Sequence, residues 1–422
     1  MDYRIFPPSE IEDTPAVELP YSKSMAIRTM ILGYIADGSI DKELKNICGD
    51  TLVTGNALAA MRDNGTEINV GSCGAAMRFI TAIAAATPGC CCTIDGDERL
   101  RKRPLAPLVN ALRTLGASIE YTGEEGHVPV KITGSRLAGG EVELDASQSS
   151  QFASALLMAA PLMSNGIEIK FKGEPRSLPY LRMTAGILAQ WGVDAEADRT
   201  GARAAGTLRK SASFCCERDW SAAAFWFEIV ALTGTWATLA GMTDKSLQAD
   251  RQEAGLFERL GALLDFEDGN AELSASPDLY NFLEADMSDM PDAVPALAVT
   301  AAMAGIPFKL TGVSSLRTKE CDRIQALTDE LLKVGIVTDT EDYGDSFVWD
   351  GTRRPIHELP VFDSHNDHRI AMALAPVSVF IPGCVVTGTE CVDKSYPEYW
   401  QHLTAAGFTL CNPDEAVEGF GE

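Results

Sequence analysis

The sequence lacks the residue patterns that mark metal-binding, disulfide-linked and membrane-spanning proteins. Its five histidines show no zinc-ligand spacing, and its eleven cysteines form no CxxC pair. The adjacent cysteines Cys90-Cys91-Cys92 and Cys215-Cys216 suit buried strands better than a disulfide framework. No apolar run reaches the roughly 18 to 20 residues that span a bilayer, and the opening Met1-Asp2-Tyr3-Arg4 is unlike a signal peptide. We therefore expect a cytoplasmic protein in a reducing compartment, with no metal.

Basic residues are also scarce. The chain has 35 Lys and Arg against 60 Asp and Glu, a net charge of −25. This charge argues against nucleic acid or an anionic membrane surface as a partner. Where basic residues do gather in so acidic a chain, we expect a local function. The 422 residues, 46% hydrophobic and 23% charged, are typical of a globular protein with two or three domains.

One α/β unit recurs six times along the chain. Six Ala-rich segments begin with polar residues, are apolar on nearly all sides and end at a glycine, which predicts helices buried all round. These segments are 22–38, 72–89, 149–166, 219–234, 292–305 and 367–383.

A shorter helix follows each of these segments and also ends at a glycine. The two glycines of a unit lie 24 to 30 residues apart, a spacing too regular for chance. Strand-like runs such as "IEIKFKG" and "ASIEYT" follow the glycines. The second glycines are Gly65, Gly116, Gly192, Gly261, Gly335 and Gly407.

The repeats indicate an α/β protein of six units. An open solenoid of six is one arrangement, but two closed groups of three bury the helices better, because helices that are apolar all round need sheets on every side. No linker of Pro, Gly and Ser separates the groups. The repeat phase places a boundary near residue 218.

Cations stand at the starts of several predicted helices. Lys23 and Arg28 lie in the opening turns of the first, Arg78 lies in the second, and His368 and Arg369 open the sixth. A helix N-terminus carries about half a positive charge, so stability alone favours acids there. Cations at this end are expected if an anion binds there.

The third buried helix opens with Ser149-Ser150-Gln151. A serine at this position can be a simple N-cap. Two serines and an amide can also form a neutral cradle for a phosphate group. The segment alone does not decide between these interpretations.

The segment Thr318-Lys319-Glu320-Cys321-Asp322-Arg323 is the most informative of the charged segments. On a helix, Lys319 and Arg323 would share a face, which weakens the helix slightly. A solvated face with a Glu320–Arg323 pair is the structural explanation. A lysine and a glutamate beside arginines also suit acid–base chemistry next to an anion site.

Three further segments contain charged or aromatic residues. Arg99, Arg101, Lys102 and Arg103 form the densest basic run, which alone is typical of a surface loop. Met290-Pro291-Asp292 opens the fifth buried helix, where Asp292 would otherwise be an N-cap. Asp219 before Trp220-Ser221 is interpreted as an N-cap only, and "AAAFWFEIV" as core.

These residues together resemble the enolpyruvyl transferases, in particular the members that act on shikimate 3-phosphate. The match runs nearly end to end and in order. Its motifs are "SKSMAIR", "GSCGAAMR", "ERLRKRPL", "SSQF", "SLPY", "MPDA", "KECDR", "NDHRIAMA" and "DKSYPEYW".

The resemblance implies a two-domain inside-out α/β barrel with three repeats per domain. It places residues 1–20 and 218–422 in domain I and residues 21–217 in domain II. It also implies transfer of the enolpyruvyl group of phosphoenolpyruvate to the 5-hydroxyl of shikimate 3-phosphate. The reaction is an addition–elimination through a tetrahedral intermediate that releases phosphate, in the pathway to chorismate and the aromatic amino acids. No cofactor is implied, and we expect a monomer whose partners are its two small-molecule substrates.

The resemblance also implies roles for individual residues. Asp292 would remove the proton of the attacking hydroxyl with Lys319 nearby, Glu320 would protonate the methylene carbon, and His368 would orient this group. The residues expected at shikimate 3-phosphate are Lys23, Ser24, Arg28, Ser149, Ser150, Gln151, Ser177, Tyr180, Asp292, Ser315 and Lys319. Those expected at phosphoenolpyruvate are Lys23, Ser72, Gly74, Arg78, Arg103, Gln151, Arg323, Arg369 and Lys394.

Several neutral positions depart from the family pattern. Tyr21 stands where glycine is usual, and Ile27 where asparagine is frequent. Ser72, Ala75 and Phe79 replace Asn, Thr and Pro, and Ser315 replaces an Asn. The charged and acid–base positions are kept, so we expect an active enzyme. Glyphosate, which competes with phosphoenolpyruvate in this family, should inhibit it more weakly than members that keep Asn, Thr and Pro.

Three alternative functions fit the sequence less well. The related transferase of UDP-N-acetylglucosamine typically has Lys-Asn in place of Lys23-Ser24, and a loop cysteine in place of Glu98. An RNA 3′-phosphate cyclase shares a related unit, but the net charge of −25 and the lack of a nucleotide motif disfavour it. A non-catalytic metabolite-binding descendant would be expected to lose its acid–base groups, which remain here.

Overall fold

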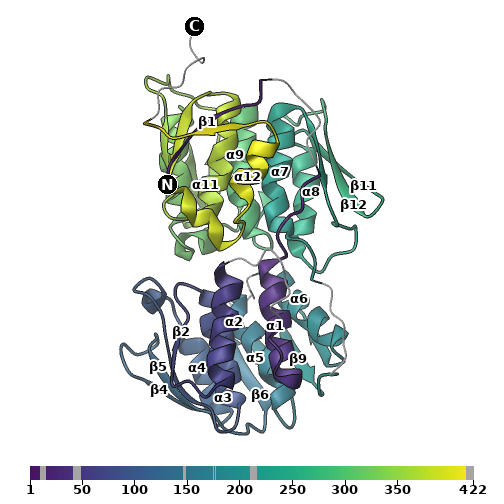
Figure 1. The fold of residues 1–422 in the computed structure, drawn as a ribbon, viewed down its shortest axis with the longest axis vertical. Helices are drawn as coiled ribbons and strands as arrows, with labels where there is room; N and C mark the ends of the chain where they lie inside the picture. The colour runs from purple at the N-terminus through teal and green to yellow at the C-terminus, as the bar shows by residue number, and fades with distance from the viewer. Residues whose placement is uncertain are drawn as a thin grey trace. The chain divides into compact units, whose positions relative to one another are not determined.

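The computed structural model of the chain describes residues 1–9, 16–40, 49–145, 149–173, 175, 177–209 and 216–414. The chain divides into two compact units: unit 1 comprises residues 1–20 and 218–422, and unit 2 comprises residues 21–217 (Figure 1). Within the described ranges, every helix is too short or too polar to span a membrane.

Unit 2 is built around helices that the sequence makes apolar on most sides. Nearly every residue of α3 (Gly74–Ala86) and α5 (Ser150–Ala159) is buried, and these two helices pack against each other. α1 (Lys23–Asp37) packs against α5 and also against α2 (Gly49–Arg62) and α6 (Leu178–Gln190). α4 (Ala106–Thr114) contacts α3 and α5. Figure 1 shows these helices with the strands of unit 2 around them.

Two four-stranded sheets of the same topology complete the described part of unit 2. Their strand orders are β2-β3-β5-β4 and β6-β7-β9-β8, and in each the first pair is parallel and the others are antiparallel. The described part of residues 21–65 holds α1 and α2 but no strand. The strands are β2 (Glu67–Asn69), β3 (Cys91–Asp95), β4 (Ser118–Tyr121), β5 (Val130–Thr133), β6 (Gly140–Asp145), β7 (Ile167–Lys172), β8 (Asp194–Ala197) and β9 (Gly201–Ala205).

Unit 1 repeats this construction. The buried helices α7 (Trp220–Thr233), α9 (Val294–Ala304) and α11 (His368–Leu374) pack against one another. α8 (Ala254–Glu258) packs on α7, and α10 (Arg323–Lys333) contacts α9 and α11. The last helix is α12 (Tyr399–Ala405).

The N-terminal strand completes the last sheet of unit 1. β1 (Tyr3–Phe6) lies antiparallel between β18 and β19 in the order β17-β18-β1-β19. In each of the other four-stranded sheets this third place is taken by the strand that comes last in the sequence. The other two sheets of unit 1 have the strand orders β13-β14-β16-β15 and β10-β12-β11. Val17 forms a parallel bridge to Leu239 of β10. The remaining strands are β10 (Trp236–Leu239), β11 (Ala262–Glu267), β12 (Asn270–Ala275), β13 (Leu283–Asp286), β14 (Phe308–Thr311), β15 (Asp339–Glu341), β16 (Ser346–Trp349), β17 (Val361–Asp363), β18 (Cys384–Thr387) and β19 (Thr409–Cys411).

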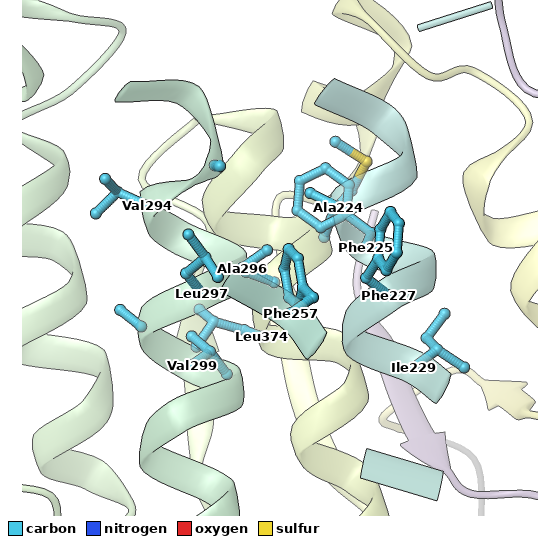
Figure 2. Packing of buried hydrophobic residues seen from close by; sticks show 14 of the residues in the cluster. Ala224, Phe225, Phe227, Ile229, Phe257, Val294, Ala296, Leu297, Val299 and Leu374 are labelled. Carbon is cyan, nitrogen blue, oxygen red and sulfur yellow. The ribbon is translucent and has the colours of Figure 1, made fainter. Parts of the chain in front are cut away.

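The core of unit 1 brings together side chains from all three buried helices and α8. Phe227 of α7 stacks on Phe257 of α8 with ring centroids 5.2 Å apart. Leu297 of α9 and Leu374 of α11 are fully buried and belong to the same cluster, part of which Figure 2 shows from close by. This packing holds the N-termini of α9 and α11 in place, where the charged residues lie.

Candidate functional site

The predicted site residues fall in both units. In unit 2, Arg28 of α1 is 3% exposed. Its Nε donates to Thr184 Oγ1 (2.7 Å), its Nη1 to the carbonyl of Ser24 (2.8 Å) and its Nη2 to Ser154 Oγ (3.4 Å). The guanidinium carbon lies 5.1 Å from the centroid of the Phe79 ring. Burial lowers the pKa of Arg28 to about 10, so the side chain stays charged at neutral pH.

Arg78, in the second turn of α3, is also 3% exposed. It donates to Gln151 Oε1 and to the carbonyl of Pro104 (3.2 Å), and its guanidinium carbon lies 5.0 Å from the Phe152 ring centroid. Burial and the charge of Arg103 lower the pKa of Arg78 to about 9.

Gly74 allows the two arginines of this cluster to lie close to the start of α3. A Cβ at this position would lie 2.6 Å from Arg103 Nη1, closer than real contacts allow, and 3.1 Å from Arg78 Nη1, which is a tight contact. Arg103 follows the 3-10 turn Leu100–Lys102, and the neighbouring Arg101 instead pairs with Asp95 at the surface. The basic run is therefore divided between a surface ion pair and the arginine cluster.

The other predicted residues of unit 2 lie at helix starts. Lys23 is the first residue of α1, with Nζ 3.4 Å from Asp50 Oδ2. Ser149 caps α5 by accepting from the Gln151 N–H (3.2 Å), which confirms the N-cap interpretation, and Ser150 follows as a buried residue. Ser177 and Tyr180 stand at the start of α6, where Ser177 adopts a left-handed conformation with φ of 54°. Ser72 is exposed, and Cys73 rather than Ser72 caps α3.

In unit 1, Arg323 is the centre of a carboxylate network. It is the first residue of α10 and is 1% exposed. Its Nη1 donates to Asp292 Oδ1 (2.8 Å), its Nη2 to Glu320 Oε2 (3.1 Å) and its Nε to Asp367 Oδ2 (2.8 Å). Burial by itself would lower the pKa of Arg323, but the surrounding carboxylates raise it well above its ordinary value.

Two more cations contact Asp292. Its Oδ1 lies 3.5 Å from Lys319 Nζ, and its Oδ2 lies 3.2 Å from Arg369 Nη2. Arg369 Nη1 also donates to the carbonyls of Asp292 (3.3 Å) and Ser221 (3.5 Å). Asp292 lies in the 3-10 turn Pro291–Ala293 before α9, with its side chain 18% exposed.

Glu320 and His368 lie on either side of this network. Glu320 Oε1 is 2.9 Å from Lys394 Nζ, so two cations contact its carboxylate. His368 is 1% exposed, and its Nδ1 lies 3.8 Å from Asp367 Oδ1, which is longer than a hydrogen bond. The network thus joins six of the residues predicted for unit 1 and places His368 beside it.

Residues 319–323 do not form the helix on which Lys319 and Arg323 would share a face. Lys319 follows the 3-10 turn Ser314–Thr318 with a non-helical backbone. α10 begins only at Arg323, capped by Asp322, which accepts from the Gln325 N–H (3.1 Å). The Glu320–Arg323 pair exists but is mostly buried, so the solvated-face interpretation is wrong as well. The described contacts do not join Ser315 to the network; its carbonyl accepts from Thr318.

Sequence reasoning missed several buried partners. The sequence pattern predicts Asp367 only as the start of a helix. In the structure it caps α11 by accepting from the Arg369 N–H (3.0 Å) and also binds Arg323. Asp250 and Glu253, in the 3-10 turn Ala249–Glu253, are also buried. Burial raises the pKa of Asp250 to about 7, with Asp292 adding to the effect. Asp219 was predicted only as an N-cap, and the structure confirms the cap: it accepts from the Ser221 N–H (3.0 Å).

Each unit, taken by itself, holds groups that suit multiply anionic ligands. Unit 2 offers buried arginines among hydroxyl and amide groups, and unit 1 offers carboxylates held by lysine and arginine. Carboxylates in such settings can exchange protons with a bound substrate. In the described part of the chain no group of His, Cys, Asp and Glu could hold a metal ion.

The comparisons with known proteins agree over nearly the whole chain. A model of the family described as EPSP synthase (3-phosphoshikimate 1-carboxyvinyltransferase) matches residues 14–403. The 3-phosphoshikimate 1-carboxyvinyltransferase of Bacteroides fragilis is 37% identical over 413 residues, covering 97% of this chain and 99% of the relative. The enzyme of that name from Methanospirillum hungatei is 33% identical over 414 residues, covering 91% and 94%.

The solved structure of EPSP synthase from Acinetobacter baumannii shares the fold. Its TM-score is 0.75 at 24% identity, over 97% of this chain and 100% of that chain. The family model and the relatives show a transferase, and the shared fold of repeated α/β units confirms the predicted fold class. The chain belongs to the EPSP synthase family.

Proposed function

We propose that this chain transfers the enolpyruvyl group of phosphoenolpyruvate to the 5-hydroxyl of shikimate 3-phosphate and releases phosphate, a step on the way to chorismate and the aromatic amino acids. Family membership supports this reaction. The observation that carries it is the network in unit 1, where Asp292 and Glu320 share Arg323 and each contacts a lysine. Two carboxylates held in this way can serve as a base and an acid in one reaction.

The substrate contacts proposed here follow the family motifs. Both substrates are multiply charged anions, and the buried arginines suit them because charged hydrogen bonds to phosphate and carboxylate groups are strong. Shikimate 3-phosphate is assigned to Lys23, Ser24, Arg28, Ser149, Ser150, Gln151, Ser177, Tyr180, Asp292, Ser315 and Lys319. Phosphoenolpyruvate is assigned to Lys23, Ser72, Gly74, Arg78, Arg103, Gln151, Arg323, Arg369 and Lys394.

The addition step uses two proton transfers. Asp292 accepts the proton of the 5-hydroxyl while the hydroxyl oxygen bonds to C2 of phosphoenolpyruvate. Glu320 delivers a proton to the methylene carbon, which gives the tetrahedral intermediate. Lys319 orients Asp292 through their 3.5 Å contact, and His368, beside Asp367, orients the group.

The elimination step reverses the proton transfer at carbon. Glu320 takes a proton back from the methyl group and the C2–O bond to phosphate breaks. The departing phosphate takes the proton that Asp292 accepted, and the product keeps the new ether bond. Substrate anions on Arg323, Arg369 and Lys394 would take over cation contacts that Asp292 and Glu320 now make. A carboxylate that loses a cation neighbour holds a proton more tightly, which suits both roles.

Glu320→Gln and Asp292→Asn test this assignment. Each should lower turnover by about 10² to 10⁴, because a positioned acid or base typically contributes that much. The measurement is a coupled phosphate-release assay with both substrates. Binding of shikimate 3-phosphate, followed by calorimetry, should persist in Glu320→Gln. Near-normal turnover in either variant removes that residue from the mechanism.

Asp322→Asn is the matched control. It lies in the same segment as Glu320 and loses a carboxylate, but asparagine caps a helix as well as aspartate does. Its turnover should stay within about twofold of the parent. If the parent itself releases no phosphate with both substrates, the chain is a metabolite-binding descendant and not an enzyme. The comparisons do not favour the UDP-N-acetylglucosamine transferase.

We also propose that the enzyme acts as a cytoplasmic monomer with small-molecule partners alone. The net charge of −25 supports the exclusion of nucleic acid and anionic membranes, since like charges repel. Sedimentation velocity at micromolar concentration should give a single species of about 45.3 kDa. A species of twice that mass would contradict the monomer.

A further inference from the structure

The buried arginines of the two units have different neighbours. In unit 1, carboxylates contact both Arg323 and Arg369. In unit 2, Arg28 and Arg78 are each 3% exposed, but no described carboxylate lies within 4.0 Å of either guanidinium. A buried charge without a counter-ion is costly. Some other group must therefore stabilise these two cations.

An aromatic ring, rather than a carboxylate, lies against each of these two guanidinium groups. The Arg28 guanidinium carbon is 5.1 Å from the Phe79 ring centroid, and the Arg78 carbon is 5.0 Å from the Phe152 centroid. Both rings are fully buried. The face of an aromatic ring attracts a cation through its quadrupole, most strongly where water is excluded. A ring has no net charge, so each site stays positive.

The hydrogen bonds leave each guanidinium able to bind an anion. Among the described residues, Arg28 uses three of its five N–H groups, on Ser24, Ser154 and Thr184. Arg78 donates to carbonyl and amide oxygens only, and its buried Nε has no described partner. A carboxylate in place of either ring would neutralise the charge and weaken its attraction for a substrate.

The two pairs are linked through α3. Arg78 and Phe79 are consecutive residues of α3: Arg78 lies against Phe152 of α5, and Phe79 lies against Arg28 of α1. Phe79 stands where the enolpyruvyl transferases usually have proline, a ring with no π face. This chain therefore has an aromatic contact to Arg28 that the usual residue would not provide.

We propose that Phe79 and Phe152 are positioning residues that hold Arg28 and Arg78 buried and oriented. Because the rings carry no net charge, both arginines keep their positive charge available for anionic substrates. Phe79 acts through Arg28 on the affinity for shikimate 3-phosphate, and Phe152 acts through Arg78 on the affinity for phosphoenolpyruvate. The choice of substrate in each case rests on the function proposed above.

The test uses the full-length enzyme with phenylalanine at position 79 replaced by its mono-, di- and trifluorinated analogues. Fluorine withdraws charge from the ring face with little change of shape. The KM for shikimate 3-phosphate should rise step by step, to about threefold to tenfold with three fluorines. The KM for phosphoenolpyruvate and kcat should stay within about twofold. The same series at position 152 should raise the KM for phosphoenolpyruvate instead.

Phe79→Leu and Phe152→Leu complete the test. Each removes a ring, should raise the same KM as its fluorinated series, and is checked for folding by thermal melting. A purely structural role would move both KM values together and would not follow the number of fluorines. Flat KM values across the fluorinated series overturn the proposal, whether or not the leucine variants fold. Failure of the proposed function is separate: the unmodified enzyme would then show no turnover with the two substrates.

Discussion

Asp250 shows how a single residue links the site to stability. It is 2% exposed, and burial with the nearby charge of Asp292 raises its pKa from 3.8 to about 7. Between about pH 4 and pH 7 the folded protein therefore holds a proton that the unfolded chain has lost. The contribution of this proton to the free energy of unfolding is fully present below pH 4. It falls by about 1.4 kcal/mol per pH unit as the pH rises towards 7.

Asp250→Asn should remove this dependence on pH, because an amide stays neutral throughout. Relative to the parent, the variant should gain stability from pH 5 to pH 7 and keep that gain at pH 8. Calorimetric melting of both proteins at these three pH values measures the difference. Parallel curves would show that Asp250 is already ionised in the folded enzyme at pH 5.

At the scale of a helix, α7 contains a buried acid that the site does not use. The helix is apolar on all sides, and Glu228 in its middle is fully buried. Neither carboxyl oxygen has a hydrogen-bond partner among the described residues, and burial raises the pKa of Glu228 well above its ordinary value. A buried polar group without partners costs stability.

Glu228→Leu should therefore stabilise unit 1, by about 1 to 3 kcal/mol. Asp219→Ala, which removes the N-cap of the same helix, should instead lower the free energy of unfolding, by about 0.5 to 2 kcal/mol. Urea unfolding of the two variants measures both effects. If Glu228→Leu is destabilised instead, the carboxyl group has a structural partner outside the described residues.

At the scale of the whole molecule, the proposed ligands of phosphoenolpyruvate come from both units. Arg78 belongs to unit 2 and Lys394 to unit 1. Arg78→Lys and Lys394→Met should each raise the KM for phosphoenolpyruvate about tenfold or more, because each weakens or removes a charged hydrogen bond worth about 1.5 to 3 kcal/mol. The KM for shikimate 3-phosphate should change by less than twofold.

Lys172→Met is the control for the loss of a lysine. This lysine pairs with Glu143 at the surface of unit 2 and should leave both KM values unchanged. The double variant Arg78→Lys with Lys394→Met should show non-additive effects if both cations act on one bound substrate. A single variant that leaves the KM for phosphoenolpyruvate unchanged would instead show that its cation does not contact this substrate.

The sequence by itself determined the repeat, the helices and the chemical class of the site. The apolar segments that end at glycine predict the helices because local propensity and capping act over a few residues, and α1, α3, α5, α7, α9 and α11 all lie within them. The charges at helix starts and the motifs from "SKSMAIR" to "DKSYPEYW" predicted the family to which the chain belongs.

Only the tertiary structure decided which charges meet. Asp367 was expected only to begin a helix, but the packing of α10 against α11 brings its carboxylate to Arg323. The chain bends at Lys319 and Glu320 and is not helical there, and these two side chains contact Asp292, Lys394 and Arg323. The ring of Phe79 meets Arg28 from 51 positions along the chain. Such contacts depend on how buried helices pack, and no local pattern in the sequence encodes that packing.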